Sequence, residues 1–385
     1  MPYTHFQFIA YQTPTFGFDL LPLEPGEFCD AVADIPVPEE NISLSADAWK
    51  RLLRLAAVVE QAYEHYSVAH QDDTLIIFVA PEFYFRPRYA SDSHSYSAEE
   101  RQEILISLER MFKNAKFRNW LIIPGTIIAN TVFEHEQYFY NTAVVIKGGT
   151  PGRISVIEKR QPSRIDGVPI IGGIANPEVA SGRYKIHYCD WSVRKKRVFR
   201  SDGIQFGLDI CLDHQGPYVD QDVRGNLFTN DNLRVAKHVA RRVNIENGAD
   251  TSIHILTAGG MKINPESVVA KNGGYVLRSD GGPGSGPNTE MKRADSYTWI
   301  THDGERVNTT PFDMYSGNHQ IVRDAGGRLV YGFPNCARAN LTNVAHITTI
   351  PLTGNLLIPS SPPPPPPFPP IYNQELVIFP VIRLP

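Results

Sequence analysis

Residues 206–214 read FGLDICLDH, an apolar run that ends in a cysteine, Cys211, followed by acidic and basic side chains. Glu82 likewise follows an apolar run, within FVAPEFYF, and so does Lys159, within SVIEKRQPS. Each segment has the composition of a buried strand that delivers one polar side chain to the rim of a sheet, where sites form. The sequence therefore predicts an α/β protein in which these three side chains meet at one rim.

The three side chains make up the set that a cysteine amidohydrolase needs. A cysteine attacks a carbonyl or nitrile carbon as a thiolate, so it requires a base and a donor for the developing negative charge. Glu82 is the candidate base, Lys159 is the candidate cation, and the backbone N–H of Leu212 is a second donor. A cysteine alone in an apolar run is usually a small buried hydrophobe, so it is the complete set that indicates catalysis.

Further strand-like stretches accompany these residues in a recognisable order. They are Val79 to Phe83, Ile122 to Thr126, Tyr140 to Ile146, Glu158 with Lys159, Phe206 to His214, and Asn247 to Asp250 followed by Ile253 to Ala258. As a set, from Phe6 to about Val330, they resemble the nitrilase superfamily of carbon–nitrogen hydrolases. The resemblance implies a four-layer αββα sandwich that pairs through a helical face, so a homo-oligomer is expected.

The same resemblance implies a two-step covalent mechanism without a metal or organic cofactor. Substrate acylates Cys211 and releases ammonia or an amine, and water activated by Glu82 then hydrolyses the thioester. After the cysteine, Leu212-Asp213-His214 is similar to the amidase and carbamoylase branch, whereas true nitrilases tend to carry Trp-Glu there. A small-molecule amide or carbamoyl substrate is therefore expected. Nitrile hydrolysis, acyl transfer and a catalytically silent scaffold remain alternatives.

Two departures from the family pattern bear on the substrate. The family often has a supporting glutamate seven residues after the lysine, and here Asp166 stands at that position with a side chain one methylene shorter. Asp166 is predicted to support the catalytic set, with Glu178 as the alternative, and its shortened side chain is the best argument for a silent scaffold. The long separation of Lys159 from Cys211 implies an inserted hairpin around 184–200.

Substrate-binding candidates are residues that lie close in sequence to the catalytic strands. They are Phe83, Tyr84, Tyr140, Asn141, Leu212, Asp213 and His214. For Phe83 and Tyr84 a place in the core is the competing interpretation. No metal site is predicted, because the residues at 134–136 and 187–190 lack partners at a recognised spacing.

Composition agrees with a large globular enzyme. The chain has 385 residues, 42% of them hydrophobic, and a formal net charge of −4, which argues against a nucleic-acid partner. No apolar stretch reaches the length of a membrane span, and the first residues lack the features of a secretory signal. Four widely spaced cysteines without a Cys-x-x-Cys pair indicate reduced thiols and a cytoplasmic location, with non-classical export left open.

Strands and helices are expected to alternate along most of the chain. Strands are predicted at 5–11, 74–80, 120–128, 140–147, 253–257, 274–278, 297–302, 320–323 and 328–332, and helices at 44–70, 97–116 and 232–247.

The carboxyl-terminal segment differs from the rest, and we divide the chain into a hydrolase domain, 1–355, and a proline-rich spacer with a strand-like arm, 356–385. The run of prolines at 362–367 must be extended, because proline fixes φ and lacks the amide hydrogen. The apolar piece at 375–384 is not expected to remain in water. We expect it to cross to a neighbouring subunit or to return over the same sandwich; the alternative is that the proline run is a ligand for an SH3-like domain.

Overall fold

The computed structural model describes most of the amino-terminal half of the chain and separate segments of the rest. The described residues are 2–13, 15, 44–66, 72–87, 95–133, 136–149, 153–159, 170–171, 174–175, 186–188, 198–214, 251–263, 268–281, 289–293, 313–314, 322–323, 329–330, 348–351, 375–379 and 381–385. Asp166, Glu178, the predicted helix at 232–247 and the predicted strand at 297–302 lie outside them.

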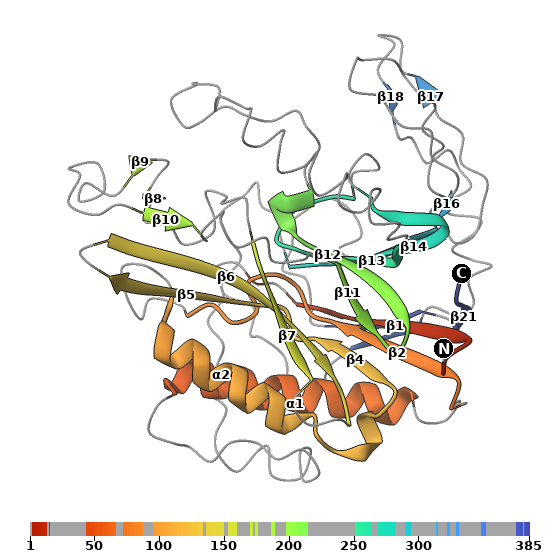
Figure 1. The fold of residues 1–385 in the computed structure, drawn as a ribbon, viewed down its shortest axis with the longest axis horizontal. Coiled ribbons are helices and arrows are strands. Elements are labelled where there is room, and N and C mark those ends of the chain that lie inside the picture. Colours follow the sequence, from red (N-terminus) through yellow and green to blue (C-terminus); the bar gives the residue numbers. More distant parts are fainter. Residues whose placement is uncertain are drawn as a thin grey trace.

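Two large β-sheets face each other, and two helices cover the outer side of the first (Figure 1). The first sheet has the order β19 (Thr348–Pro351), β20 (Glu375–Ile378), β1 (His5–Gln12), β2 (Thr74–Val79), β4 (Trp120–Ile123), β6 (Glu136–Lys147), β5 (Thr126–Phe133) and β3 (Tyr96–Ser97). Three more strands pair alongside, namely β7 (Ile154–Glu158) and β10 (Ile186–Tyr188) with β6, and β21 (Ile382–Arg383) with β1.

The second sheet carries the cysteine. Its order is β11 (Val198–Ser201), β12 (Ile204–Ile210), β13 (Thr251–Ala258), β14 (Ala270–Asp280), β15 (Thr289–Arg293) and β16 (Asp313–Met314). The single-turn helix η3 (Cys211–His214) follows β12 directly. Two short hairpins stand apart, β8 (Ile170–Ile171) with β9 (Ile174–Ala175), and β17 (Val322–Arg323) with β18 (Leu329–Val330). The last of these joins the two strands predicted at 320–323 and 328–332.

The central strands are buried on both faces, which explains their nearly continuous apolar sequences. In β1, Phe6 and Phe8 lie in the core between the two sheets, whereas Ile9 and Tyr11 lie in the core beneath the helices. The alternation follows from the two-residue period of a strand. The described layers are therefore helices, first sheet and second sheet. The fourth layer of the expected αββα sandwich stays a prediction.

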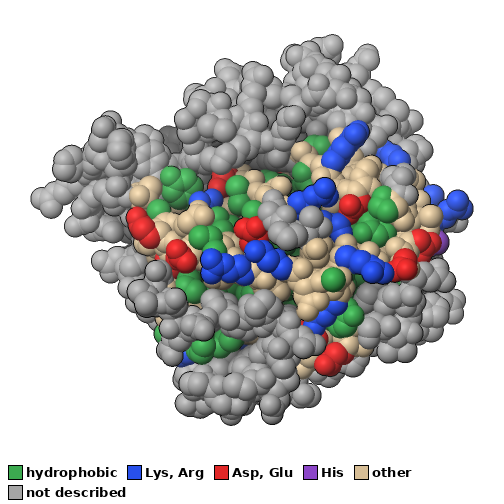
Figure 2. Space-filling model, turned by 60° about the horizontal axis from the view of Figure 1, so that its bottom comes forward, with side chains coloured by type: hydrophobic (Ala, Val, Ile, Leu, Met, Phe, Trp, Pro, Cys, Tyr) green, Lys and Arg blue, Asp and Glu red, His purple; other side chains and the backbone are tan. Residues whose placement is uncertain are grey.

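The two covering helices begin where the sequence places caps. Before α2 (Ala98–Met111), the Ser97 hydroxyl accepts the Glu100 amide at 3.1 Å, and acidic residues occupy the first turn. Before α1 (Ala46–Tyr66), the Ser45 hydroxyl accepts the Ala48 amide at 3.2 Å. The 3₁₀ turn η2 (Ala115–Phe117) lies between α2 and β4. α2 buries an apolar stripe and exposes charges of both signs, whereas residues 51–59 of α1 are all buried. The face turned toward the viewer in Figure 2 carries acidic and basic side chains among apolar ones.

Two sequence predictions need correction. The single strand predicted at 120–128 is two strands, β4 and β5, because the chain turns at Pro124-Gly125, where Gly125 has φ +84°. The two described strands within the hairpin predicted around 184–200 do not pair with each other, since β10 pairs with β6 and β11 pairs with β12. The reason is that β6 is long enough to pair with two strands along one edge. β7 pairs with residues 142–146 of β6, and β10 pairs with residues 137–139.

The carboxyl-terminal arm returns to its own chain. β20 lies between β19 and β1 and is antiparallel to both, and β21 pairs with the beginning of β1. The Phe379 and Leu384 amides donate to the Phe8 and Thr4 carbonyls, each at 2.9 Å. The arm therefore covers the edge of β1 within the chain, and the division at 355/356 stays a prediction. No helix in the described ranges combines the length and hydropathy that crossing a membrane requires.

Candidate active site

Glu82 lies on a tight turn just after β2, with its side chain completely buried. Its amide donates to the carbonyl of Ala258, the last residue of β13 in the second sheet, at 3.3 Å. The next residue, Phe83, has φ +64°, and its amide donates to the hydroxyl of Thr126 at 2.9 Å. A positive φ at a bulky residue is a strained conformation, which neighbouring contacts must hold. The turn that carries Glu82 is thus held by both sheets.

Gly125 allows the neighbouring strand to approach this turn closely. A Cβ atom at this position would lie 2.4 Å from the Pro81 carbonyl oxygen and 2.7 Å from the Tyr84 Cβ. Both positions are much closer than van der Waals contact, and the first is backbone, which cannot rotate away. Glycine is therefore required for steric reasons as well as for its positive φ.

We expect Gly125→Ala to destabilise the fold by about 1–3 kcal/mol beyond the effect of backbone strain, because the overlap displaces the turn. Gly260→Ala is the matched control, since Gly260 also has a positive φ, +107°, but an added Cβ there meets nothing within 4 Å. The difference between the two free energies of unfolding in urea measures the overlap. Equal losses would show that close approach at Gly125 contributes nothing.

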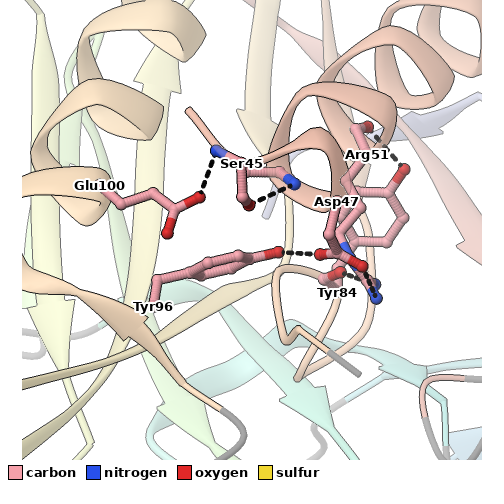
Figure 3. Close-up of polar contacts among 7 residues, drawn as sticks. Ser45, Asp47, Arg51, Tyr84, Tyr96 and Glu100 are labelled. Carbon is pink, nitrogen blue, oxygen red and sulfur yellow. Dashed lines mark hydrogen bonds and ion pairs between the residues drawn. The ribbon is translucent and has the colours of Figure 1, made fainter. Parts of the chain in front are cut away.

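A buried polar network beneath the turn connects it to α1 (Figure 3). The Arg51 guanidinium donates to the Tyr84 carbonyl at 2.6 Å, and the Tyr84 hydroxyl donates to the Arg51 carbonyl at 3.0 Å. Asp47 pairs with Arg51 at 2.7 Å and accepts the Tyr96 hydroxyl. Burial raises the pKa of Tyr84 and of Tyr96 well above the ordinary value, so both phenols stay protonated and donate.

Lys159 directly follows β7, and its side chain meets the carboxylate of Glu82. Its Nζ lies 2.8 Å from Glu82 Oε1, and neither side chain is exposed to solvent. Asn141 lies on β6, and its side-chain amide donates to the same carboxylate oxygen at 2.9 Å. Its backbone carbonyl accepts the Lys159 backbone amide at 2.8 Å. Asn141 was predicted to bind substrate. Its hydrogen bonds hold the Glu82 carboxylate and the backbone of Lys159, and its role toward substrate stays a prediction.

A second buried network holds the strand end that presents Lys159. Glu158 accepts Arg101 of α2 at 2.5 Å and the Thr142 hydroxyl at 2.7 Å, and Arg101 also donates to that hydroxyl at 2.9 Å. Glu158 and Thr142 are buried. Charge-assisted hydrogen bonds of this kind are among the stronger ones in proteins. The helical layer therefore fixes the position of Lys159 as well as that of Glu82.

Cys211 is the first residue after β12, 4% exposed, with φ +43°. The neighbouring strand β13 joins it to the turn that carries Glu82. Ile210 is aligned with Thr257, whose hydroxyl donates to the Ala80 carbonyl at 3.1 Å, and the next residue, Ala258, accepts the Glu82 amide. The strand ends that carry the cysteine and the glutamate thus lie at the same end of the facing sheets.

The other predicted site residues have different surroundings. Phe83 is buried, with the Lys159 ammonium 5.7 Å from its ring centroid, whereas Tyr84 packs in the core beneath α1. This packing does not support the substrate-binding role predicted for Tyr84. Tyr140 is half-buried, with the Arg101 guanidinium 5.3 Å from its ring centroid.

The residues after the cysteine remain close to it. Leu212 is half-buried, and Asp213 and His214 are buried within η3. Asp166 and its alternative, Glu178, lie outside the described residues.

Sequence reasoning did not single out Asp209 or His254, which lie next to this site. With His214 they form a group, within the described part of the chain, whose potential metal-ligating atoms all lie within 4.8 Å of one another. Their signal in the sequence was an acid and a histidine placed inside otherwise apolar strands. Carboxylate and imidazole are ligands for zinc or iron, so the protonation of these rings decides what the group does.

Comparisons with known proteins give distant similarities. No protein-family model matches the chain, and no curated protein matches it. Solved structures similar to it include a glutamine-dependent NAD+ synthetase from Acinetobacter baumannii, at 12% identity and TM-score 0.34, covering 75% of this chain and 40% of that one. They also include an amidase from Nesterenkonia sp., at 12% identity and TM-score 0.38, covering 75% of this chain and 83% of that one. Another is the NitN amidase from Neterenkonia sp. AN1, at 13% identity and TM-score 0.35, covering 75% and 82%.

The chain therefore spans less than half the length of the synthetase that it matches. TM-scores this low do not establish a shared fold or activity. The arrangement of residues within the site carries the functional argument.

Proposed function

We propose that this chain is a cysteine-dependent hydrolase of non-peptide carbon–nitrogen bonds, acting on an amide or carbamoyl group of a small molecule. The observation that carries the proposal is the ion pair of Glu82 with Lys159, at 2.8 Å and without solvent exposure, at the same end of the facing sheets as Cys211. A buried ion pair is weak evidence of stabilisation, because removing two charges from water offsets their attraction. Buried ionisable groups beside a strained nucleophile are typical of active sites.

In the proposed first half-reaction, the Glu82 carboxylate takes the proton of the Cys211 thiol as sulfur bonds to the carbonyl carbon. The carbonyl oxygen becomes negative and is held by the Lys159 ammonium and the Leu212 backbone N–H. The tetrahedral intermediate then breaks its carbon–nitrogen bond, and the leaving nitrogen takes the proton from Glu82. The products are a thioester on Cys211 and free ammonia or amine.

In the second half-reaction, Glu82 takes a proton from water as the water oxygen bonds to the thioester carbon. The sulfur leaves and recovers that proton, which restores the thiol and releases a carboxylic or carbamic acid. The hydrogen bond from Asn141 directs one carboxylate oxygen toward Lys159 in both halves. Asp166 is proposed to support the set, and a homo-oligomer and a cytoplasmic location remain predictions.

The experiment measures ammonia release by the wild-type protein from a panel of simple amides, carbamoyl amino acids and nitriles. We expect turnover with at least one amide or carbamoyl compound, and loss of about 10³-fold or more in Cys211→Ala. Intact mass of the wild type, quenched with acid in the presence of each compound of the panel, should detect the acyl adduct on Cys211. Turnover from nitriles alone would favour nitrile hydrolysis. A panel without turnover and without an adduct would favour a silent scaffold.

A further inference from the structure

One oxygen of the Asp209 carboxylate faces two histidines from different elements. His214 Nδ1 of η3 and His254 Nε2 of β13 each lie 3.0 Å from Asp209 Oδ2. The two rings meet edge to face, with centroids 5.1 Å apart at 68°. All three residues are buried. The group joins the strand before the cysteine, the turn after it and the neighbouring strand.

The proton on His254 can be assigned from its other nitrogen. The Val269 backbone N–H, which is always a donor, approaches His254 Nδ1 at 3.2 Å. Nδ1 must therefore carry the lone pair, and the neutral ring carries its proton on Nε2. A metal ion at Nε2 would need a lone pair at that nitrogen. The Nε2–H is instead a donor to Asp209.

The position of Asp209 follows from the alternation of β12. Ile204, Phe206, Leu208 and Ile210 face the core between the sheets, so Asp209 lies on the opposite face. His254 lies on that same face of β13, because Ile253 and Ile255 occupy the inner core. The Asp209 carboxylate therefore contacts β13 through His254 and η3 through His214.

Cys211 lies inside the loop that these hydrogen bonds close. Residues 209 and 214 flank the nucleophile in sequence, and one carboxylate oxygen holds them together. The backbone of Cys211, with φ +43°, is in a strained conformation that persists only where its surroundings enforce it. His254 anchors the closed loop to the strand that also contacts the turn of Glu82.

We propose that Asp209, together with His214 and His254, is a positioning device that holds the backbone of Cys211 in its strained conformation and so directs the thiol toward Glu82 and Lys159. The inference deepens the proposed hydrolase and rests on it for its effect on turnover. Its effect on the reactivity of the thiol does not depend on knowing the substrate.

The test is Asp209→Asn, which keeps the shape of the side chain and removes the charge. We expect the rate of Cys211 alkylation by iodoacetamide to fall by about 100-fold, the scale of loss for a displacement of about 1 Å at a reacting centre. With any amide that the wild type hydrolyses, kcat should fall similarly while KM changes little. Asp73→Asn is the matched control, because Asp73 also pairs with a histidine, His5 at 3.4 Å, at an exposed site.

A second pair of variants covers the case in which Asp209→Asn does not fold. The amide nitrogen of asparagine can stand where His214 Nδ1 stands, so His214→Asn keeps the donor and His214→Leu removes it. We expect the asparagine variant to alkylate within about threefold of wild type and the leucine variant to lose most of its reactivity. Equal rates for both would overturn the proposal.

Two further outcomes separate this inference from the proposed function. A wild type that alkylates rapidly but hydrolyses nothing would contradict the hydrolase and leave the positioning role standing if Asp209→Asn still alkylates slowly. Folded Asp209→Asn with wild-type alkylation and turnover would overturn the positioning role and leave the hydrolase standing. Stoichiometric zinc in the purified wild type, lost in Asp209→Asn, would also overturn it.

Discussion

Lys159→Met is expected to abolish turnover and to destabilise the fold by about 3–5 kcal/mol, because it leaves the Glu82 carboxylate buried without its cation. The wild-type pair is separated by 2.8 Å with no solvent exposure on either side chain, so water cannot replace the ammonium without rearrangement of the site. The two effects are measured separately, by ammonia release from an active amide and by the free energy of unfolding in urea.

The double variant Glu82→Gln with Lys159→Met separates stability from activity. It removes both charges and keeps the approximate volume of each side chain, so we expect its stability to return to that of the wild type or to exceed it. Turnover should remain lost, since neither a base nor a cation is present. A double variant as unstable as Lys159→Met would mean that the pair is primarily a structural element.

The exposed pair formed by Arg118 and Asp72 provides the control for burial. Its side chains are 66% and 86% exposed, and such pairs contribute at most about 1 kcal/mol. Arg118→Met should therefore leave both stability and turnover close to wild type. If Lys159→Met retains full turnover, the role of Lys159 in holding the oxyanion is wrong.

Much of the sheet architecture was predictable, because local signals and tertiary packing agree there. Ser97 before an acidic first turn marks the start of α2, and the apolar run before Cys211 forms β12 as expected. The prediction that Glu82, Lys159 and Cys211 come together rested on strand ends meeting at one rim. Glu82 and Lys159 lie in direct contact, and their contact with Cys211 stays a prediction.

Other features depend on contacts that a linear pattern does not contain. The break between β4 and β5 at Gly125 depends on how closely the Pro81 backbone approaches it. The pairing of β10 with β6 depends on the part of the β6 edge that β7 does not cover. The role of His254 depends on an amide from residue 269, fifteen positions away in sequence. In each case the deciding partner comes from a distant segment, so residue type and periodicity alone could not identify it.

Truncation after Ser361 is expected to prevent folding of the whole chain. It removes β20 and β21, and with them a set of buried apolar side chains, Leu376, Val377, Ile378, Phe379 and Ile382. Each contributes about 1.5–3 kcal/mol when buried, so together they contribute about 7–15 kcal/mol. That range equals the entire stability of an ordinary protein, about 5–15 kcal/mol. The truncation would also expose the edge of β1, which invites aggregation.

Two neighbouring residues of the arm test this explanation at the level of single side chains. Ile382 is buried between the sheets, whereas Val381 beside it is 42% exposed. Ile382→Ala should cost about 2–5 kcal/mol in the free energy of unfolding, and Val381→Ala less than about 0.5 kcal/mol. Because the arm pairs with β1 of its own chain, these values should not change with protein concentration. A folded truncated chain with an unchanged thermal midpoint would show that the arm is dispensable, and stability that rises with concentration would indicate an arm donated by a neighbouring subunit.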